Sequence, residues 1–380
     1  MIKNIGIACA ATLLKLACPW YLRRLMITRI VQPALLMLFL FVSIAACVLF
    51  PSSRRALHTP SLSDVFVWQD FEAAFPVPDE LRAHVAFWKA IFTQYRRRQI
   101  VLHDNWHPQV VYEVVDMERT RGISAALAKY RRILMSLDAK EQRGALGELT
   151  AEEARVAALF AGIDEPGKFR KAAYQRLRTQ CGQRESFRKA IQLSGLYQEK
   201  FEEIFAKYGL PLVLTRIPFV ESYFNHNAAS YAGAAGIWQF MPATARMYGL
   251  RINGRVDERY DPFKAADSAA RLLKANYDLL GSWPLAITAY NHGPAGMLNA
   301  VKELGTDDFG KIARAYRGDK FGFYSRNYYA QFVAAAQIML DEQSYFGQVE
   351  RLAPLANSAD FQRMFPPAAP ATFLARTTQP

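Results

Sequence analysis

Glu221 is the residue whose setting most clearly indicates chemistry. It ends an apolar run, Ile217–Val220, in a helix that we expect to begin near Pro211, and Ser222 follows it. Desolvation disfavours the charged form of a carboxyl group, and the carboxyl end of a helix disfavours an anion, so both effects favour protonation. A carboxylic acid that stays protonated near neutral pH can act as a general acid. We predict that role for Glu221, against the alternative of a surface glutamate that ends a helix.

A second block, residues 233–242, combines small, aromatic and amide side chains (Gly-Ala-Ala-Gly-Ile-Trp-Gln-Phe-Met-Pro). Its two glycines have no Cβ, so the backbone there can come close to a ligand. Gln239 is the polar member, and we predict that it contacts a substrate. Its neighbours Trp238 and Phe240 suit a core as well as a binding groove, and Phe240 is included among the predicted substrate-binding residues.

A third block, Ala289–Gly293, ends an apolar helix that begins near Pro284, and it contains Tyr290 and Asn291. An asparagine just before the end of a helix also suits a carboxyl cap, which is the alternative to a binding role. His292 is ionisable, but we expect it to be a neighbour of the site rather than a catalytic residue.

The three blocks, in this order and at this spacing, resemble those of the lytic transglycosylases. The likeness is to the soluble-lytic-transglycosylase catalytic domain, which is related to goose-type lysozyme, and especially to the membrane-bound murein transglycosylase D type. It covers residues 205–340. The resemblance implies a mostly α fold, in which a helical N-terminal domain precedes a lysozyme-like catalytic domain. It also implies that the substrate is the glycan strand of peptidoglycan.

The resemblance implies roles for individual residues as well. Tyr290 would hydrogen-bond and orient Glu221. Asn291 would contact the substrate beside the scissile bond, and Gln239 would line the glycan groove. Ser222 favours the catalytic interpretation of its neighbour, and we count it among the predicted substrate-binding residues.

One stretch departs from the family pattern. Many relatives carry a Glu-Thr-Arg-x-Tyr motif near the end of the domain, and the matching stretch here is Tyr324–Tyr328. Arg326 and Tyr328 are retained, but a tyrosine stands where the glutamate would be. We expect the change to affect substrate contacts or helix anchoring and to leave the proposed acid in place. Tyr328 is also predicted to bind substrate.

Only one carboxylate is evident in these blocks, whereas most glycosidases use two. A mechanism with one carboxylate fits: Glu221 would protonate the oxygen between N-acetylmuramic acid and N-acetylglucosamine, while the 2-acetamido group stabilises the oxocarbenium ion. Glu221 would then accept a proton from the muramyl C6 hydroxyl as a 1,6-anhydro ring closes. This reaction needs no metal or organic cofactor. A muramidase that uses water and a non-catalytic cell-wall-binding scaffold are the alternatives.

The length of 380 residues suits two domains and an anchor. Within the first domain, apolar spacing predicts helices over 81–95, 121–137 and 151–161, and short strands over 100–102 and 110–112. The predicted parts are a signal or membrane anchor over 1–55, a helical N-terminal domain over 56–200, a lysozyme-like transglycosylase domain over 201–346 and an Ala- and Pro-rich tail over 347–380.

His103 and His107 are four residues apart and could be written as a pair of metal ligands. Residues 105–108 suit a turn rather than a helix, and no third ligand is obvious. We therefore predict no metal site. Cys181 is the one cysteine beyond the leader, and we expect it to be a partly buried small hydrophobic residue.

The amino-terminal residues indicate export. Residues 31–50 form an uncharged run, long enough to span a bilayer or to be the hydrophobic region of a signal peptide. Ile44–Cys47 resembles a lipobox, in which Cys47 would carry the lipid. A lipoprotein, an N-terminal membrane helix and a cleaved signal stay open, as does a start at Met1 or Met26. We expect the protein to be anchored to the bacterial membrane at the periplasmic face of the cell envelope.

The composition agrees with an envelope role. A net charge of +13 and 51% apolar residues indicate a folded, basic protein with a polyanionic partner. The sequence shows no zinc finger, glycine-rich phosphate loop or RNA-binding signature, so its charge alone does not favour nucleic acid as that partner. An anionic cell wall or lipid surface is the better match.

Overall fold

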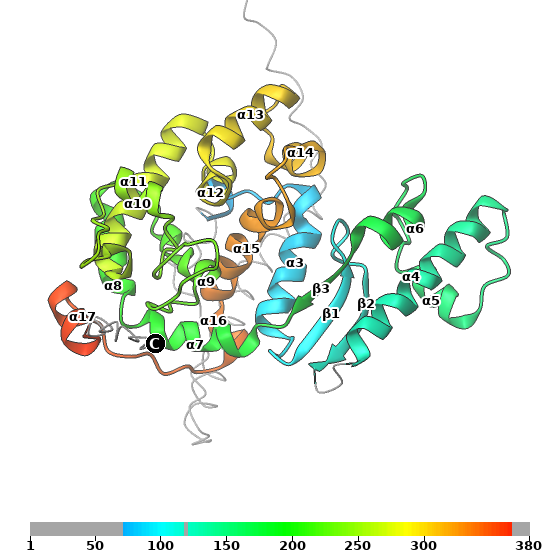
Figure 1. The fold of residues 1–380 in the computed structure, drawn as a ribbon, viewed down its shortest axis with the longest axis horizontal. Coiled ribbons are helices and arrows are strands. Elements are labelled where there is room, and N and C mark those ends of the chain that lie inside the picture. The colour runs from blue at the N-terminus through cyan, green and yellow to red at the C-terminus, as the bar shows by residue number, and fades with distance from the viewer. Residues whose placement is uncertain (1–70, 118–120, 367–380) are drawn as a thin grey trace, which may run out of the picture. The chain divides into compact units, whose positions relative to one another are not determined.

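The computed structural model describes residues 71–117 and 121–366, and most of them are helical (Figure 1). The predicted mostly α fold is confirmed. The predictions for the anchor, including Cys47, and for the end of the tail, 367–380, lie outside the described residues. Within the described ranges, no helix is both long enough and apolar enough to cross a membrane.

The helices fall into three groups along the chain. α3 (Asp79–Thr93) precedes the strands β1 (Gln99–Asp104) and β2 (Val111–Asp116). Between β2 and the strand β3 (Leu177–Cys181) lie α4 (Arg121–Gln142), α5 (Ala151–Ala158), α6 (Lys168–Lys171) and the π-helix η2 (Ala172–Arg176). After β3 come α7 (Arg184–Ser194), α8 (Gln198–Lys207), the 3₁₀ helix η3 (Leu212–Arg216), α9 (Pro218–Glu221), α10 (Pro242–Met247), the 3₁₀ helix η4 (Glu258–Tyr260), α11 (Pro262–Leu280), α12 (Trp283–His292), α13 (Pro294–Leu304), α14 (Phe309–Ala315), α15 (Phe323–Leu340), α16 (Glu342–Phe346) and α17 (Ser358–Met364).

Prolines set several of these helix boundaries. The α-helices from α9 to α13 each carry a proline in the first turn, where its missing N–H breaks no helical hydrogen bond. The 3₁₀ helix η4, which lies between α10 and α11, contains no proline. Pro218 also explains why the helix predicted to run from Pro211 to Glu221 is split into η3 and α9, because proline cannot donate to the preceding turn. Asp261 caps α11 through the N–H groups of its second and third residues, in the turn predicted there.

The described residues form a three-stranded antiparallel sheet in the order β2–β1–β3. β1 (Gln99–Asp104) and β2 (Val111–Asp116) overlap the two predicted strands. β3 (Leu177–Cys181) carries no comparable sequence signal, because every residue in it is half-buried or exposed. Cys181 itself is exposed, so the expectation of partial burial is wrong. The cysteine ends an edge strand, where only one side has a neighbour.

The buried apolar side chains form two clusters. The larger one joins α3 to the helices from α7 onward and includes Trp88 and Trp238. The smaller one joins the sheet to α4, α5 and α6 and includes Tyr112. The division between the clusters therefore lies inside the segment 56–200, and α3 packs on the same core as the predicted catalytic domain.

A buried polar contact fixes α3 against α15. Oδ1 of Asn327 accepts a hydrogen bond from Trp88 Nε1 at 3.0 Å and lies 2.9 Å from His84 Nδ1. Burial lowers the pKa of His84 to about 4, so the imidazole is neutral, and Nδ1 must carry the proton that Asn327 accepts. Because Tyr328 is the next residue on α15, this contact also fixes the direction in which Tyr328 projects.

Candidate active site

Glu221 is placed by a short helix and a strained turn. It is the last residue of α9, and Tyr223 and Phe224 follow it with φ values of 53° and 57°. Residues other than glycine rarely adopt such angles, and the residues that do adopt them cluster at functional sites. The buried Ser222 hydroxyl donates to the Ile237 carbonyl oxygen at 2.8 Å, which ties the turn to the block 233–242.

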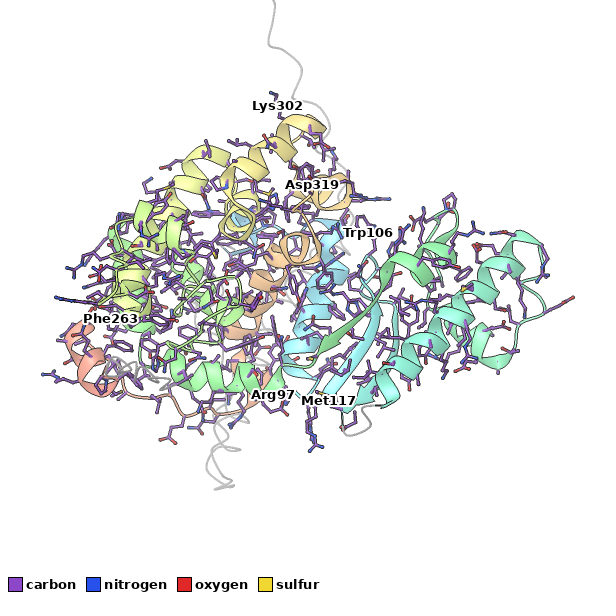
Figure 2. The ribbon with its side chains drawn as sticks, viewed as in Figure 1. Arg97, Trp106, Met117, Phe263, Lys302 and Asp319 are labelled. Carbon is purple, nitrogen blue, oxygen red and sulfur yellow. The ribbon has the colours of Figure 1, made fainter. Side chains whose placement is uncertain are left out.

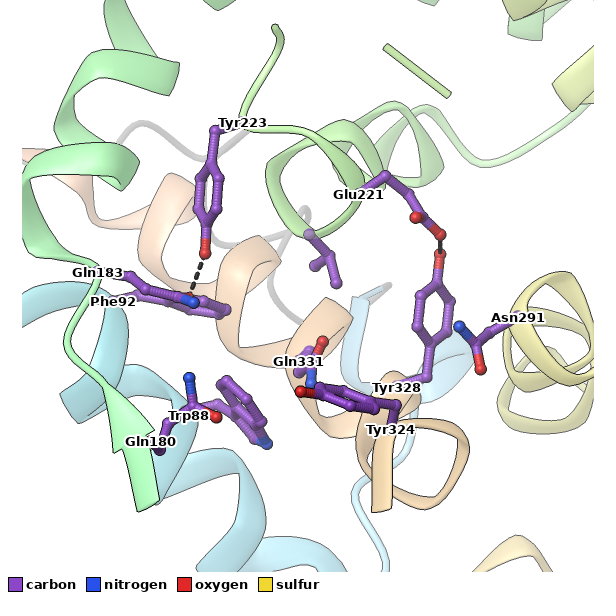
Figure 3. A pocket seen from close by; sticks show the side chains of 11 residues that line it. Trp88, Phe92, Gln180, Gln183, Glu221, Tyr223, Asn291, Tyr324, Tyr328 and Gln331 are labelled. Atoms are coloured by element: carbon purple, nitrogen blue, oxygen red, sulfur yellow. Dashed lines mark hydrogen bonds between the residues drawn. The ribbon is translucent and has the colours of Figure 1, made fainter. Parts of the chain in front are cut away.

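Tyr328 is the hydrogen-bonding partner of the Glu221 carboxyl group (Figure 3). Its hydroxyl donates to Oε1 of Glu221 at 2.5 Å. Burial raises the pKa of Glu221 to about 7, and the hydrogen bond from Tyr328 opposes that rise. The carboxyl group is therefore partly protonated near neutral pH, which is the state that a general acid needs.

Tyr290 does not have the hydrogen bond to Glu221 that the sequence analysis assigned to it. Its hydroxyl donates to the Trp238 carbonyl oxygen at 2.8 Å, and its ring is parallel to that of Tyr328, with 6.5 Å between ring centres. The charge of Glu221 contributes to the raised pKa of both tyrosines, after burial, which is the larger cause. The hydrogen bond to Glu221 comes from α15 because α15 packs against α9, whereas the end of α12 faces the block 233–242.

Gln239 is engaged with the backbone of its own loop. It has a φ of 49°, and its Nε2 donates to the carbonyl oxygens of Gly236 at 2.8 Å and Ala228 at 3.3 Å. Gly236 is needed for packing rather than for approach to a ligand, since a Cβ there would lie 1.9 Å from the Arg259 carbonyl oxygen. Phe240 is buried, and its ring meets that of Tyr290 edge-on.

Arg259 holds the two ends of this loop together, a role that the sequence does not reveal. Its Nη1 donates to the carbonyl oxygens of Gly233 at 2.6 Å and Phe240 at 3.0 Å, and its Nη2 pairs with Asp257 at 2.6 Å. In the sequence Arg259 is one of several charged residues in a predicted turn. Nothing in the local pattern marks carbonyl groups about twenty residues earlier as its partners.

The side chain of Glu221 lines a pocket of about 700 Å³. Of the predicted site residues, Asn291 and Tyr328 line it with Glu221, while Ser222, Gln239, Phe240 and Tyr290 do not. Asn291 is exposed, and its Oδ1 accepts from Ser325 Oγ at 2.9 Å. Glu221 is the only carboxylate among the described residues that line the pocket. The pocket is lined by Trp88, Phe92, Gln180, Gln183, Val220, Glu221, Tyr223, Asn291, Tyr324, Tyr328 and Gln331.

Four of the lining residues come from the predicted N-terminal domain. Trp88 and Phe92 lie on α3, Gln180 on β3, and Gln183 just after it, and Figure 3 shows them across the pocket from Asn291. The Tyr223 hydroxyl donates to Gln183 Oε1, which links this wall to the turn after Glu221. Sequence reasoning missed these residues, because the apolar spacing of α3 indicates only a buried face.

The histidine pair is part of the fold around the sheet. The His103 ring is buried against Phe87, with 4.5 Å between ring centres, and its Nδ1 lies 3.0 Å from the Asp104 carbonyl oxygen. His107 Nε2 lies 3.6 Å from a carboxylate oxygen of Glu165. Across the described ranges, no group of three or more histidine, cysteine, aspartate or glutamate side chains is arranged to hold a metal ion.

Comparison with known families identifies the segment that carries Glu221. Residues 201–312 match the Transglycosylase SLT domain. The family resemblance of the three blocks is therefore confirmed. The SLT match begins within α8 and contains α9, the block 233–242 and α12, and it ends within α14, before Tyr328.

The matched relatives align with only part of this chain. The membrane-bound lytic murein transglycosylase D of Escherichia coli is 38% identical over 97 residues, which are 25% of this chain and 22% of the relative. A peptidoglycan transglycosylase of Escherichia phage T7 is 32% identical over 139 residues, which are 35% of this chain and 10% of the relative. The chain thus spans about a fifth or less of the length of these relatives.

Solved structures that align with part of this chain include the 70 kDa soluble lytic transglycosylase of Escherichia coli. That chain aligns with a TM-score of 0.32 and 20% identity, over 40% of this chain and 25% of its own. The lytic transglycosylase Slt of Pseudomonas aeruginosa, an inactive mutant, aligns with a TM-score of 0.32 and 16% identity, over 58% of this chain and 31% of its own.

Proposed function

We propose that this protein is a peptidoglycan lytic transglycosylase, with Glu221 as its general acid and base. It cleaves the β-1,4 bond between N-acetylmuramic acid and N-acetylglucosamine without water and leaves 1,6-anhydromuramyl ends. The observation that carries the proposal is the state of Glu221, the one carboxylate among the described residues that line its pocket, whose pKa is raised by burial to about 7. The SLT match over residues 201–312 supports the choice of substrate.

The two oxygens of Glu221 have different roles in this proposal. Oε1 accepts the hydrogen bond from Tyr328, so the transferable proton is on Oε2. In the first step Oε2 gives its proton to the bridging oxygen as the bond from that oxygen to C1 of the muramyl sugar breaks. The hydrogen bond from Tyr328 then stabilises the carboxylate that forms, because charge-assisted hydrogen bonds are stronger than neutral ones.

Closure of the 1,6-anhydro ring returns the proton to Glu221. The C6 hydroxyl oxygen of the muramyl sugar attacks C1, and its proton passes to Oε2 of Glu221, so the acid is regenerated in each turnover. The 2-acetamido group stabilises the oxocarbenium ion between the two steps, which supplies the role that a second carboxylate has in most glycosidases. Asn291, which lines the pocket beside Tyr328, is positioned to contact the sugar next to the scissile bond.

Peptidoglycan lies outside the cytoplasmic membrane, so this activity requires export. The uncharged run at residues 31–50 supports an anchored protein at the periplasmic face of the bacterial cell envelope, held by a lipid on Cys47 or by an N-terminal helix. Mass spectrometry of tryptic peptides from the membrane fraction distinguishes these two anchors, because only the lipoprotein begins at a lipidated Cys47.

The test is digestion of purified peptidoglycan by the full chain in detergent, with identification of the released muropeptides by mass spectrometry. Products lighter by one water than hydrolytic muropeptides, absent with Glu221→Gln, are expected. Reducing muropeptides would instead identify a muramidase. Binding of peptidoglycan without any released product would identify a cell-wall-binding scaffold.

A further inference from the structure

Three arginines gather around one tryptophan, outside the Glu221 pocket. The guanidinium carbons of Arg326, Arg317 and Arg176 lie 3.9, 4.3 and 5.7 Å from the ring centre of Trp106. They come from the first turn of α15, the residues after α14 and the end of η2, so three separate parts of the chain supply them. Figure 2 labels Trp106 beside the sheet, on the side of α14 and α15.

Two of these arginines keep their hydrogen-bonding capacity for another group. Arg176 is paired with Glu165 through two hydrogen bonds, of 2.6 and 2.7 Å. Within the described residues, neither Arg317 nor Arg326 has a carboxylate at ion-pair distance. Among the described residues, Arg317 donates from Nη1 only to backbone carbonyl oxygens, and no group accepts from the buried Nε of Arg326. Burial, followed by repulsion from Arg317 and Arg176, lowers the pKa of Arg326 to about 10, and the group stays charged near pH 7.

The arginines line a cavity suited to an oxyanion. It has an empty volume of about 630 Å³, and no carboxylate is among the described residues that line it. Planar guanidinium groups bind carboxylates through paired hydrogen bonds, and amide side chains add further donors. This arginine pocket is lined by Asn105, Trp106, Gln175, Arg176, Arg317, Phe323 and Arg326.

The arginine pocket and the Glu221 pocket share the start of α15, and β3 runs from the end of η2 beside the former to the latter. Phe323 lines the former and Tyr324 the latter, at the start of α15, while Gln180 lines the Glu221 pocket four residues after Arg176. β3 begins at Leu177, the residue after Arg176. A strand rises about 3.3 Å per residue, so Gln180 lies about 10 Å along β3 from Leu177. Arg178 lies between them, 4.0 Å from the ring centre of Phe323. An extended chain of about three residues covers the same distance.

We propose that the arginine pocket binds a carboxylate of the peptide stem carried by the muramyl sugar, while the glycan occupies the Glu221 pocket. This inference rests on the proposed function. The stem peptide extends from the muramyl sugar and carries carboxylates within a few residues of it, which matches the separation of the two pockets. The pair of pockets then selects glycan that bears peptides over glycan that lacks them.

The test compares two substrates with full-length protein: glycan strands that carry their peptides, and the same strands after an amidase has removed them. The readout is the ratio of kcat/KM on the first substrate to kcat/KM on the second. In the double variant Arg317→Gln/Arg326→Gln, this ratio is expected to fall about tenfold, since hydrogen bonds to a charged group are lost. Arg317→Gln alone changes an exposed residue, so it tests the same effect without risk to the fold.

Arg314→Gln is the matched control, because Arg314 is exposed, lies on α14 and does not line the arginine pocket. It is expected to keep the wild-type ratio. Cleavage of both glycans with an unchanged ratio in the double variant would overturn the inference and leave the proposed function intact. Cleavage of neither glycan by the wild-type protein would overturn the proposed function instead.

Direct titration separates the sources of the oxyanion. A stem tetrapeptide with free carboxylates is titrated into the full-length protein by calorimetry, and inorganic phosphate is titrated in parallel. Binding of the tetrapeptide, weakened about tenfold by Arg317→Gln and unaffected by Arg314→Gln, supports the inference. Binding of phosphate without binding of the tetrapeptide overturns it and assigns the pocket to a phosphate-bearing ligand.

Discussion

The two walls of the Glu221 pocket differ in chemistry and in origin. One wall contains Glu221, Asn291 and Tyr328, and the first two lie within the SLT match. The other comes from α3 and β3 and offers aromatic rings and carboxamides, including Trp88 and Gln180, and none of the described residues that form it is ionisable. Aromatic and amide side chains suit the apolar faces and hydroxyl groups of sugars. Under the proposed function, proton transfer and substrate retention are supplied by different parts of the chain.

The largest expected effect is on the first wall. Glu221→Gln removes the only carboxylate among the described residues that line the pocket, and kcat for release of muropeptides is expected to fall at least about a thousandfold. Substrate binding should persist, because the glutamine keeps the shape of the side chain. Glu203→Gln, at an exposed glutamate paired with Lys200, is the control. A loss of kcat of less than tenfold in Glu221→Gln would contradict the assignment of Glu221 as the acid.

Tyr328→Phe tests how the first wall sets the protonation of Glu221. The hydrogen bond from Tyr328 lowers the pKa of Glu221, so its removal is expected to raise that pKa above about 7. The alkaline limb of the pH profile of kcat/KM should move to higher pH, and kcat should fall about tenfold, because the carboxylate formed in the first step loses a donor. Tyr329→Phe removes a neighbouring hydroxyl that donates to the Pro76 carbonyl oxygen, and it should leave the profile in place.

The buried carboxyl group of Glu221, in the first wall, should also reduce the free energy of unfolding of the protein. A carboxyl group whose pKa is raised on folding binds protons more tightly in the native state, so stability falls as pH rises from about 4.5 through about 7. Glu221→Gln removes this loss and is expected to raise the free energy of unfolding by about 3 kcal/mol at pH 8, and by much less at pH 5. Urea unfolding at the two pH values measures the difference, and an equal effect at both would contradict the raised pKa.

A substitution in the second wall should give the smallest effect, and it should change KM rather than kcat. Gln180→Ala is expected to raise KM about threefold to tenfold with little change in kcat, because under the proposed function the side chain, which lines the pocket, contacts substrate and takes no part in proton transfer. Thr179→Ala changes the adjacent residue on the opposite face of β3 and serves as the control. A fall in kcat with KM unchanged would show that the two walls do not divide their roles in this way.

The sequence predicts the first wall far better than the second. Glu221 and Asn291 stand in short blocks whose residue types report their chemistry directly. Trp88 and Phe92 sit on a helix whose apolar spacing fits any buried face, and only the packing of α3 against α15 brings them to the pocket. β3 escapes prediction because its partly exposed residues lack an apolar pattern.

The sequence also does not predict which side chains form hydrogen bonds with one another. Tyr290 and Tyr328 are chemically alike, and both lie close enough for the charge of Glu221 to affect them. Which of them donates depends on the direction of two helices, and the family resemblance assigned the wrong one. Gln239 and Gly236 appear in the sequence as ligand-facing residues, whereas the structure uses both to build the loop.

The end of the SLT match has a consequence for protein engineering. The match stops at residue 312, yet the hydroxyl that tunes the acid belongs to Tyr328 on α15, and α15 is locked to α3 through Asn327. If the matched segment alone were exchanged between two relatives, Glu221 would be transferred without Tyr328, the residue that adjusts its proton affinity. A working chimera must carry α3 and α15 together with the segment, as a single portable unit.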